Sequence, residues 1–564
     1  RLMTSSAFSA TVLAVMVARP ASAGRMVVQG LEPRALWSHF ADISAIPRPS
    51  KHEQRVLEHL KGIADSKRLP WKQDGAGNLL IKAPGRGAGV SAAPVVIQGH
   101  VDMVTEKNSA TKHDFMADGI ALKRSGDGKW LQADGTTLGA DNGIGVAAAC
   151  ALLDEPDDTP LPPLELLFTV DEETGLTGAK ELDPVALGIT ARTMLNLDTE
   201  EWGALYIGCA GGGDISMDIP LAREAAPVGP DAALVEVRVE GLMGGHSGIN
   251  IHEGRANALC LLAATARRAM NSAGPGVRLV TIKGGDKHNA IPREARMVLA
   301  VPRDALPAAL DAAKASAELM RNEYPNEPSA SLVAEELTAS DGDTRPADEE
   351  STTRALDVLI SIPHGPLKFS NEVPGLVETS NNLAAVSTSE ASLKVLCSSR
   401  SFLGPAIEAV RDRLRAVAAT MGRGTVHMPP AYPGWKPNTQ SRVLALSKQI
   451  LGDMLRTEKA DATPEILAIH AGLECGLIGE KCDAGLPPGT PPMDMVSFGP
   501  TITGAHSPDE RVEIATVAPF YDLVKRVLAS LATVEAGTAP DEAGKQTLAT
   551  TGCGNADDGA RRSV

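Results

Sequence analysis

The chain has 564 residues, which is too long for one ordinary domain, since domains usually hold about 100–200 residues. Hydrophobic residues make up 43% and charged residues 22%, a composition that is typical of soluble globular proteins and excludes a fibrous or disordered one. The net charge of −16, without any basic stripe, argues against a nucleic-acid partner. No stretch after residue 25 approaches the ~20 apolar residues of a membrane helix, so no membrane partner is expected.

The first 25 residues allow three interpretations. An apolar run followed by Ala21-Ser22-Ala23 is typical of a signal peptide, whereas three arginines, several serines and no acidic residue suit an organelle transit peptide. The third is that Met26 is the true start and that the preceding residues are a gene-model artefact. The seven cysteines lack C-x-x-C spacing, and their odd, sparse number fits a reducing compartment. We therefore expect a cytoplasmic protein, with an organellar or secreted location as the alternative if residues 1–25 are a targeting segment.

The predicted elements begin with two amphipathic helices over residues 33–69, divided at Pro47-Arg48-Pro49-Ser50, where Ser50 or a neighbour caps the second helix. Short apolar runs then alternate with helical stretches. This alternation predicts an α/β domain with a largely parallel sheet flanked by helices, whose functional groups lie at the carboxyl ends of the strands. The apolar runs are 78–81, 94–98 and 164–170.

The pattern changes near residue 211, and residues 234–240 alternate with period two, as a half-exposed antiparallel strand does. We predict an α+β lid domain over 215–428, inserted into a catalytic domain that is formed by 26–214 and 429–536. The tail, 537–564, is polar and rich in small residues, which predicts disorder. The sequence shows no internal repeat.

The first candidate for chemistry is Gly99-His100-Val101-Asp102, directly after a predicted strand. Because side chains alternate along an extended chain, His100 and Asp102 point to the same side. A metal-binding histidine usually donates its second ring N–H to a carboxylate, and Asp102 is one candidate for that carboxylate. The pattern alone is weak, because a histidine at a strand end is more often a satisfied structural residue.

Acidic residues follow at three further points of the chain. Asp141 lies in the glycine-rich GADNG segment, where it is either a helix N-cap or a ligand that bridges two ions. Asp171, Glu172 and Glu173 follow one apolar strand and Asp198 follows another, without a basic neighbour. Although a solvated charge run is the usual explanation, acids at the end of a buried strand are costly unless a cation or a proton offsets their repulsion. Adjacent glutamates can divide into a ligand and a general base.

The order of these residues is H-x-D, GADNG, E-E-x-G, NLDTEE and a distant GAHSPDE. It resembles the dinuclear-zinc metallopeptidases, which include carnosinases, aminoacylases and dipeptidases, and among them the aminoacyl-histidine dipeptidases. The resemblance covers about residues 33–530 and rests on long strings. They are TTLGADNGIG, GLMGGHSG, NAIPREA, AYPGW, IHAGLECGL and MDMVSFGPTITGAHSPDE.

The resemblance implies two divalent metal ions per chain. Zn²⁺ is expected, with Co²⁺ or Mn²⁺ as alternatives, because all three accept nitrogen and oxygen ligands. Asp141 would bridge the two ions, His100 and Asp198 would complete one site, and Glu173 and His506 would complete the other.

Further roles follow from the same resemblance. Asp102 would orient His100, and Glu172 would be the general base that takes a proton from the attacking water. The segment around Ser247 does not form the G-x-S-x-G motif of a nucleophilic serine, because Ile249 stands where glycine would be needed. In relatives the matching histidine reaches the substrate carbonyl, so His246 is expected to stabilise the oxyanion.

Three more residues resemble substrate ligands. They are Asn289, Gly472 and Arg400, of which Arg400 is suited to grip a terminal carboxylate with two parallel hydrogen bonds. We expect a small dipeptide substrate with a free carboxylate, including Xaa-His dipeptides such as carnosine, a lid that closes over it, and a homodimer. The alternatives are an aminoacylase acting on N-acyl amino acids and a non-catalytic metal-binding scaffold.

Overall fold

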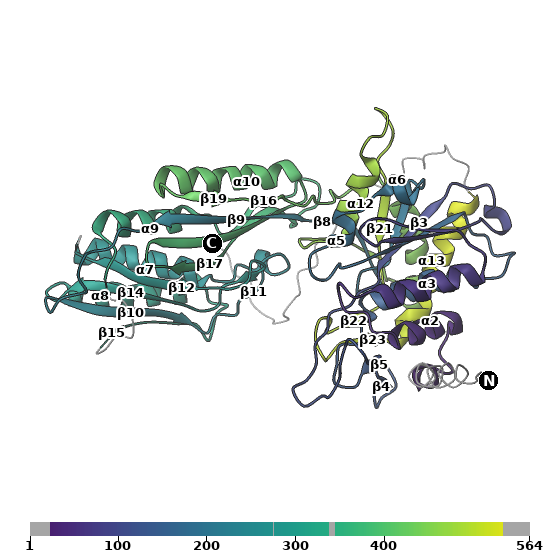
Figure 1. Ribbon diagram of the computed structural model, residues 1–564, viewed down its shortest axis with the longest axis horizontal. Helices are drawn as coiled ribbons and strands as arrows, with labels where there is room; N and C mark the ends of the chain where they lie inside the picture. Colours follow the sequence, from purple (N-terminus) through teal and green to yellow (C-terminus); the bar gives the residue numbers. More distant parts are fainter. Residues whose placement is uncertain (1–22, 275, 338–344, 534–564) are drawn as a thin grey trace, which may run out of the picture. The chain divides into compact units, whose positions relative to one another are not determined.

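The computed structural model describes residues 23–274, 276–337 and 345–533, which form two compact units (Figure 1). Of the described residues, the first unit holds 23–209, 435–468 and 473–533, and the second holds 210–434 and 469–472. The predictions of a targeting segment within residues 1–25 and of a disordered tail over 537–564 fall almost entirely outside this part of the chain. No helix of the described residues is long and apolar enough to cross a membrane.

The first unit contains an eight-stranded sheet in the order β1-β2-β6-β3-β7-β21-β8-β20. Its central strands β6, β3, β7 and β21 run parallel, whereas β2 pairs antiparallel with both β1 and β6, and β8 with β21. The predicted α/β class is therefore confirmed, with the parallel pairing at the centre of the sheet. The strands are β1 (Trp71–Gln73), β2 (Leu79–Ala83), β3 (Val95–His100), β6 (Leu164–Thr169), β7 (Thr193–Asn196), β8 (Ala204–Cys209), β20 (Glu465–Ile469) and β21 (Asp494–Ser497).

Alternating strand residues of this sheet serve its two faces. Val95 and Ile97 of β3 join an apolar core with helices α2, α3, α4, α11 and α13. Gln98 and His100 point to the other face, where Gln98 contacts Glu474 at the start of α12. The two helices predicted over 33–69 are confirmed as α2 and α3. The helices are α2 (Arg34–Ser44), α3 (Gln54–Ser66), α4 (Ala140–Leu152), α5 (Thr177–Lys180), α6 (Pro184–Leu187), α11 (Arg442–Glu458), α12 (Glu474–Asp483) and α13 (Ile514–Thr533).

A smaller four-stranded sheet of the first unit, in the order β22-β23-β5-β4, supports the loop that carries His506. This loop connects β22 to β23, so the small sheet holds both of its ends. The strands are β4 (Leu122–Arg124), β5 (Trp130–Ala133), β22 (Ile502–Thr503) and β23 (Arg511–Glu513).

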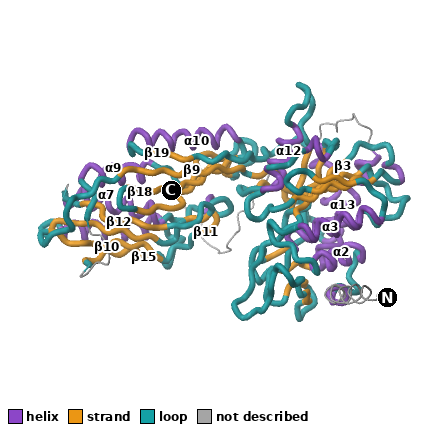
Figure 2. The backbone as a smooth tube through the Cα atoms, viewed as in Figure 1, coloured by secondary structure: helices purple, strands orange, loops and turns teal. Residues whose placement is uncertain are grey.

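The second unit contains a nine-stranded antiparallel sheet in the order β15-β10-β14-β12-β17-β18-β9-β19, with β16 paired to β17. Helices α7, α8, α9 and α10 share one apolar core with this sheet. Figure 2 shows the strands of the sheet in orange and α7, α9 and α10 in purple. The elements are β9 (Gly211–Pro220), β10 (Ala232–Glu240), α7 (Ala258–Ala273), β12 (Arg278–Gly284), β14 (Ala295–Pro302), α8 (Leu306–Glu323), β15 (Ser331–Glu336), α9 (Glu349–Ser361), β16 (Gly365–Phe369), β17 (Val377–Thr388), β18 (Ser392–Ser401), α10 (Gly404–Ala416) and β19 (Thr425–His427), with the short pair β11 (Gly245–His246) and β13 (Ala290–Ile291).

The second unit repeats one topology, which the sequence did not reveal. β10-α7-β12-β14-α8-β15 and β9-α9-β17-β18-α10-β19 are both βαββαβ arrangements, and their strand orders within the sheet mirror each other across the β12–β17 pair. The first arrangement is inserted between β9 and α9 of the second. An inserted copy leaves no tandem period in the sequence. The topology therefore repeats although the sequence shows no internal repeat.

Candidate active site

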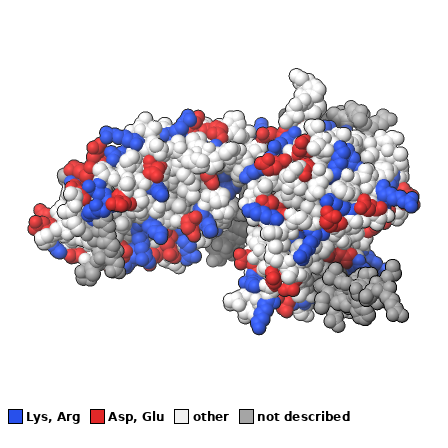
Figure 3. All heavy atoms as spheres, in the orientation of Figure 1, with Lys and Arg blue, Asp and Glu red and all other residues white. Residues whose placement is uncertain are grey.

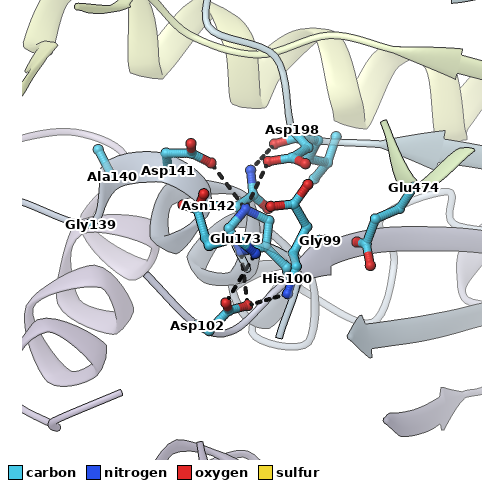
Figure 4. Close-up of polar contacts among 12 residues, drawn as sticks. Gly99, His100, Asp102, Gly139, Ala140, Asp141, Asn142, Glu173, Asp198 and Glu474 are labelled. Carbon is cyan, nitrogen blue, oxygen red and sulfur yellow. Dashed lines mark hydrogen bonds and ion pairs between the residues drawn. The ribbon is translucent and has the colours of Figure 1, made fainter. Parts of the chain in front are cut away.

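The five predicted metal ligands lie together at the carboxyl edge of the central parallel strands. Four of them, His100, Asp141, Glu173 and Asp198, are labelled in Figure 4. His100 ends β3, Glu173 follows β6, and Asp198 follows β7. Asp141 lies in the turn that begins α4, and His506 lies in the loop between β22 and β23. Parallel strands that end at one edge bring together residues that are far apart in the sequence.

Asp141 lies between the two histidines and contacts each with a different oxygen. Its Oδ1 is 3.0 Å from His100 Nε2, and its Oδ2 is 3.3 Å from His506 Nε2. His100 Nε2 is also 3.3 Å from Asp198 Oδ1, and His506 Nε2 is 3.0 Å from Glu173 Oε2. Asp141 is thus shared by two sets of three residues, His100–Asp141–Asp198 and Asp141–Glu173–His506.

These two sets fit a pair of divalent cations. Within each set, one nitrogen or oxygen atom of every residue lies within 4.8 Å of the others. Imidazole nitrogen and carboxylate oxygen are ligands that Zn²⁺ and similar ions accept. Glu173 Oε1 is buried and has no hydrogen-bond partner among the described residues, as expected of a ligand atom.

The carboxylates of this cluster favour positive charge on its two histidines. Burial opposes protonation of His100, but the carboxylates of Asp198, Asp102 and Asp141 outweigh it and raise the pKa of His100 well above its usual value. Hydrogen bonds to Asp141 and Glu173 raise the pKa of His506 to about 11. Divalent cations would replace these protons and offset the same carboxylates.

Asp102 contacts both His100 and the turn that carries the adjacent glutamates. Its Oδ1 lies 3.3 Å from His100 Nδ1, and its two oxygens accept hydrogen bonds from the backbone N–H groups of Glu172 and Glu173. Ser50, one candidate for a helix cap, instead donates its hydroxyl to Asp102 at 2.7 Å. Asp102 is therefore placed to orient an imidazole and a ligand-bearing turn at once.

Glu172 lies beside the ligand cluster. One oxygen of this residue falls within 4.8 Å of atoms of His100 and Glu173. Burial, together with the negative charges of Asp198 and Glu173, raises the pKa of Glu172 well above its usual value, despite the opposing effect of His100. A carboxylate with a raised pKa is a better base than an exposed glutamate.

A further acidic group, Glu53, Asp102 and Asp171, also has ligand geometry, but each of its carboxylates already accepts hydrogen bonds. Glu53 accepts hydrogen bonds from the backbone N–H groups of Lys51 and Asp171, and Asp171 accepts from two threonine hydroxyls. Hydrogen-bond donors thus satisfy this group without a cation.

Sequence reasoning missed several buried charged residues beside the cluster, among them Arg48, Glu474 and Glu510. Glu474 Oε2 accepts hydrogen bonds from Gln98 Nε2 and Thr169 Oγ1, each at 2.6 Å. Arg48 and Glu510 bind the backbone around Asp141. Glu474 and Glu510 lie inside strings that carried the family resemblance, but their partners come from distant segments.

In the second unit, the surroundings of His246 fix its tautomer. Its Nδ1 accepts hydrogen bonds from the backbone N–H groups of Gly248 and Ile249, each at 3.1 Å. Burial, with the charges of Arg400 and His288, lowers the pKa of His246 to about 4. The ring is therefore neutral near pH 7, with its proton on Nε2, which leaves Nε2–H as a donor.

Arg400 is a buried cation with unused donors, and its side chain belongs to β18. Only 5% of the residue is exposed, and its side chain makes one hydrogen bond among the described residues, a long one of 3.4 Å from Nη1 to Tyr432 Oη. Its Nε is buried and has no hydrogen-bond partner in the part of the chain that the structure describes. A buried guanidinium with free donors is a site for a carboxylate.

The other two predicted substrate ligands lie in the same unit as His246. The backbone carbonyl of Asn289 accepts a hydrogen bond from Ser247 N at 2.8 Å, so Asn289 supports the loop that carries His246. Gly472 belongs to residues 469–472, where His470 Nε2 lies 2.8 Å from Ser380 Oγ. The structure places Asn289 and Gly472 within this unit.

Comparisons with known proteins agree with this arrangement. Residues 237–328 match the model of a peptidase dimerisation domain. The chain is 37% identical to the cytosol non-specific dipeptidase of Escherichia coli over 498 residues, 88% of this chain and 98% of that protein. It is 36% identical to the crystal structure of aminoacylhistidine dipeptidase from Vibrio alginolyticus, with a TM-score of 0.78 over 92% of this chain and 99% of that one. A 162-residue stretch is 29% identical to the uncharacterized protein YqjE of Bacillus subtilis and covers 27% and 39% of the two chains.

An α/β unit with a His, Asp and Glu cluster at the carboxyl edge of its sheet, joined to a second sheet unit, defines a metallopeptidase. The extent of the match to the Escherichia coli protein places this chain more narrowly. It belongs to the M20 peptidase family, with the cytosol non-specific dipeptidases, which confirms the resemblance found in the sequence.

Proposed function

We propose that this chain hydrolyses the peptide bond of dipeptides that carry a free C-terminal carboxylate. Its sequence identity to named dipeptidases, which extends along nearly their whole length, makes it a dipeptidase. The single observation that carries the chemistry is Asp141, whose two carboxylate oxygens face two histidines, each within a separate ligand set.

Two divalent ions, Zn²⁺ or else Co²⁺ or Mn²⁺, would be held by the two ligand sets. His100, Asp141 and Asp198 would hold one ion, and Asp141, Glu173 and His506 the other. Such ions supply Lewis-acid polarisation of the scissile carbonyl and lower the pKa of an attacking water. Asp102 holds the His100 ring, since its oxygens contact both that ring and the Glu172–Glu173 turn.

Glu172 is the general base of this proposal. Its carboxylate takes one proton from the attacking water as the water oxygen forms a bond to the carbonyl carbon. It then delivers that proton to the leaving nitrogen as the C–N bond breaks, so the products are two amino acids. The raised pKa of Glu172 favours the first transfer, because it lets the carboxylate accept the proton and hold it until the second step.

His246 and Arg400 act on the substrate. The Nε2–H of neutral His246 would donate to the carbonyl oxygen as negative charge develops there, a contribution of about 3–4 kcal/mol by comparison with other such donors. Arg400 would bind the terminal carboxylate with its free donors. Asn289 and Gly472 are proposed as further substrate ligands, supported by their placement in the unit that carries His246.

The cellular location and the oligomeric state are proposed from the relatives. A cytoplasmic location follows from the cytosolic relative, and the match to a peptidase dimerisation domain supports a homodimer. Strand β12 lies within the matched residues and already pairs with β17 of the same chain. A second copy of the chain would therefore have to bind to another surface of this domain. Acidic and basic side chains are interspersed on the face drawn in Figure 3.

A substrate panel tests the proposal and separates its alternatives. Metal-free protein is reloaded with Zn²⁺, Co²⁺ or Mn²⁺ and given β-Ala-His, Ala-His, Leu-Gly and N-acetyl-Leu. We expect metal-dependent cleavage of the free dipeptides and none of N-acetyl-Leu. Cleavage of N-acetyl-Leu alone would assign an aminoacylase, and bound metal without any cleavage would indicate a metal-binding scaffold.

A further inference from the structure

The turn that carries Asp141 is held by a single buried carboxylate. Glu510 is 2% exposed and accepts hydrogen bonds from four consecutive backbone N–H groups. Its Oε2 accepts from Leu138 and Gly139 at 2.7 and 2.9 Å, and its Oε1 accepts from Ala140 and Asp141 at 2.7 and 3.3 Å. These N–H groups lie at the start of α4, where a negative charge is favourable.

The same turn is held from its carbonyl side by Arg48, which is 1% exposed. Its Nη2 donates to the Gly139 carbonyl at 2.5 Å, and its Nη1 donates to the carbonyls of Val101 and Asp102 at 3.0 and 2.8 Å. A Cβ atom at Gly139, where φ is +68°, would collide with Arg48 Nη2. The guanidinium therefore fits closely between the turn and the chain that follows β3.

Together the two side chains connect three segments that carry ligands. Glu510 lies four residues after His506 on the same loop and binds the Asp141 turn. Arg48 binds the Asp141 turn to the residues directly after His100. The side chain of His506 is 56% exposed, so its position depends on its loop rather than on surrounding packing.

We propose that Arg48 and Glu510 are positioning residues that fix the spacing of the two metal sites by holding the shared ligand Asp141 against the segments of His100 and His506. This inference rests on the metal centre of the proposed function. A merely structural alternative exists, because a buried carboxylate at a helix start also stabilises the fold. A substitution should weaken metal binding if the residue positions the ligands, and should leave metal binding unchanged if the residue only stabilises the fold.

Glu510→Gln is the sharpest test, because glutamine keeps the shape but turns an NH₂ group toward two backbone N–H donors. Partners that orient ligands typically contribute about 10–100-fold to metal affinity, and we expect a loss of that size for the more weakly held ion. Affinity is measured by competition with a chromophoric chelator. Co²⁺-loaded protein should also show shifted visible absorption bands, which report ligand geometry independently of activity.

Glu165→Gln is the matched control within the same unit. Glu165 is equally buried and accepts hydrogen bonds from the backbone N–H groups of Thr190 and Ala191 and from Lys82 Nζ. It lies near the start of β6, at the opposite end of that strand from the ligands. Both variants should lower the melting temperature of the metal-free protein, but only Glu510→Gln should weaken metal binding and shift the Co²⁺ bands.

Wild-type metal affinity and Co²⁺ bands in a folded Glu510→Gln protein would overturn the inference and leave Glu510 a structural residue. If Glu510→Gln does not fold, Arg48→Lys takes its place, because one ammonium group cannot bind all three carbonyls in the same way. The same loss of metal affinity is expected, and unchanged affinity would again overturn the inference. Failure of the wild-type protein to bind two ions would instead contradict the proposed function.

Discussion

Replacement of Arg400 by methionine should weaken dipeptide hydrolysis without destabilising the protein. Among the described residues, the Arg400 Nε has no partner and the side chain makes a single hydrogen bond, 3.4 Å long, so several donors can bind a carboxylate. Each hydrogen bond to a charged group contributes about 1.5–3 kcal/mol, so loss of two costs at least about 3 kcal/mol. This corresponds to a fall of roughly 100-fold or more in kcat/KM.

The effect on stability should be the reverse of what deletion of a buried residue usually produces. A buried cation without an ion pair is costly, and methionine fills a similar volume without that cost. We therefore expect an unchanged or higher melting temperature for Arg400→Met. The matched control is Arg411→Met in α10 of the same unit, because Arg411 is also buried but donates to Glu408 and to the Pro429 carbonyl. That control should lower the melting temperature and leave the kinetics unchanged.

Steady-state kinetics on Ala-His and on its C-terminal amide provide the assay. The loss in kcat/KM should appear with the free dipeptide and be small with the amide, which carries no carboxylate for Arg400 to bind. Equal losses on both substrates, or no loss on either, would refute the assigned role of Arg400.

Three further predictions concern the base, the oxyanion donor and a buried histidine. Glu172→Gln should bind two ions as the wild type does, measured by elemental analysis, yet lose about 10²–10⁴-fold in kcat; retained turnover would exclude Glu172 as the base. His246→Ala should lose about 10²–10³-fold in kcat, and the wild-type rate should show no titration of His246 between pH 5 and 8, since its pKa is about 4. Burial lowers the pKa of His364 from 6.5 to about 4, and Asn257 Nδ2 lies 3.3 Å from its Nδ1. As pH falls, His364 therefore binds a proton in the unfolded chain before it does so in the folded protein. The free energy of unfolding should fall by on the order of 3 kcal/mol as pH drops from about 6.5 to about 4. An equal fall in the His364→Gln variant would contradict this.

Much of the fold could be predicted because local patterns set it. The two helices before residue 70, the strand that ends at His100 and the strand that ends before Glu172 each follow from hydrophobic periodicity and turn residues. The parallel order of those strands then brings their ends together. The repeated topology of the second unit could not be predicted, because one βαββαβ arrangement is inserted into the other and interrupts any period.

The candidate site likewise contains residues that sequence patterns predict and residues that only the fold reveals. The predicted metal ligands could be found in the sequence because each lies at the end of an apolar run or in a distinctive string. Ser50, Arg48, Glu474 and Glu510 were not, because their partners come from segments distant in sequence, and no spacing pattern reports such contacts. The tautomer of His246 likewise depends on backbone N–H groups whose direction only the fold determines.

The most direct test of the two-metal dipeptidase is a titration of metal-free protein with Zn²⁺ or Co²⁺, with hydrolysis of Ala-His followed at each step. The proposed centre predicts no hydrolysis without metal and a rate that reaches its maximum at two ions per chain. Full hydrolysis by the metal-free protein, or a maximum at one ion per chain, would contradict the account.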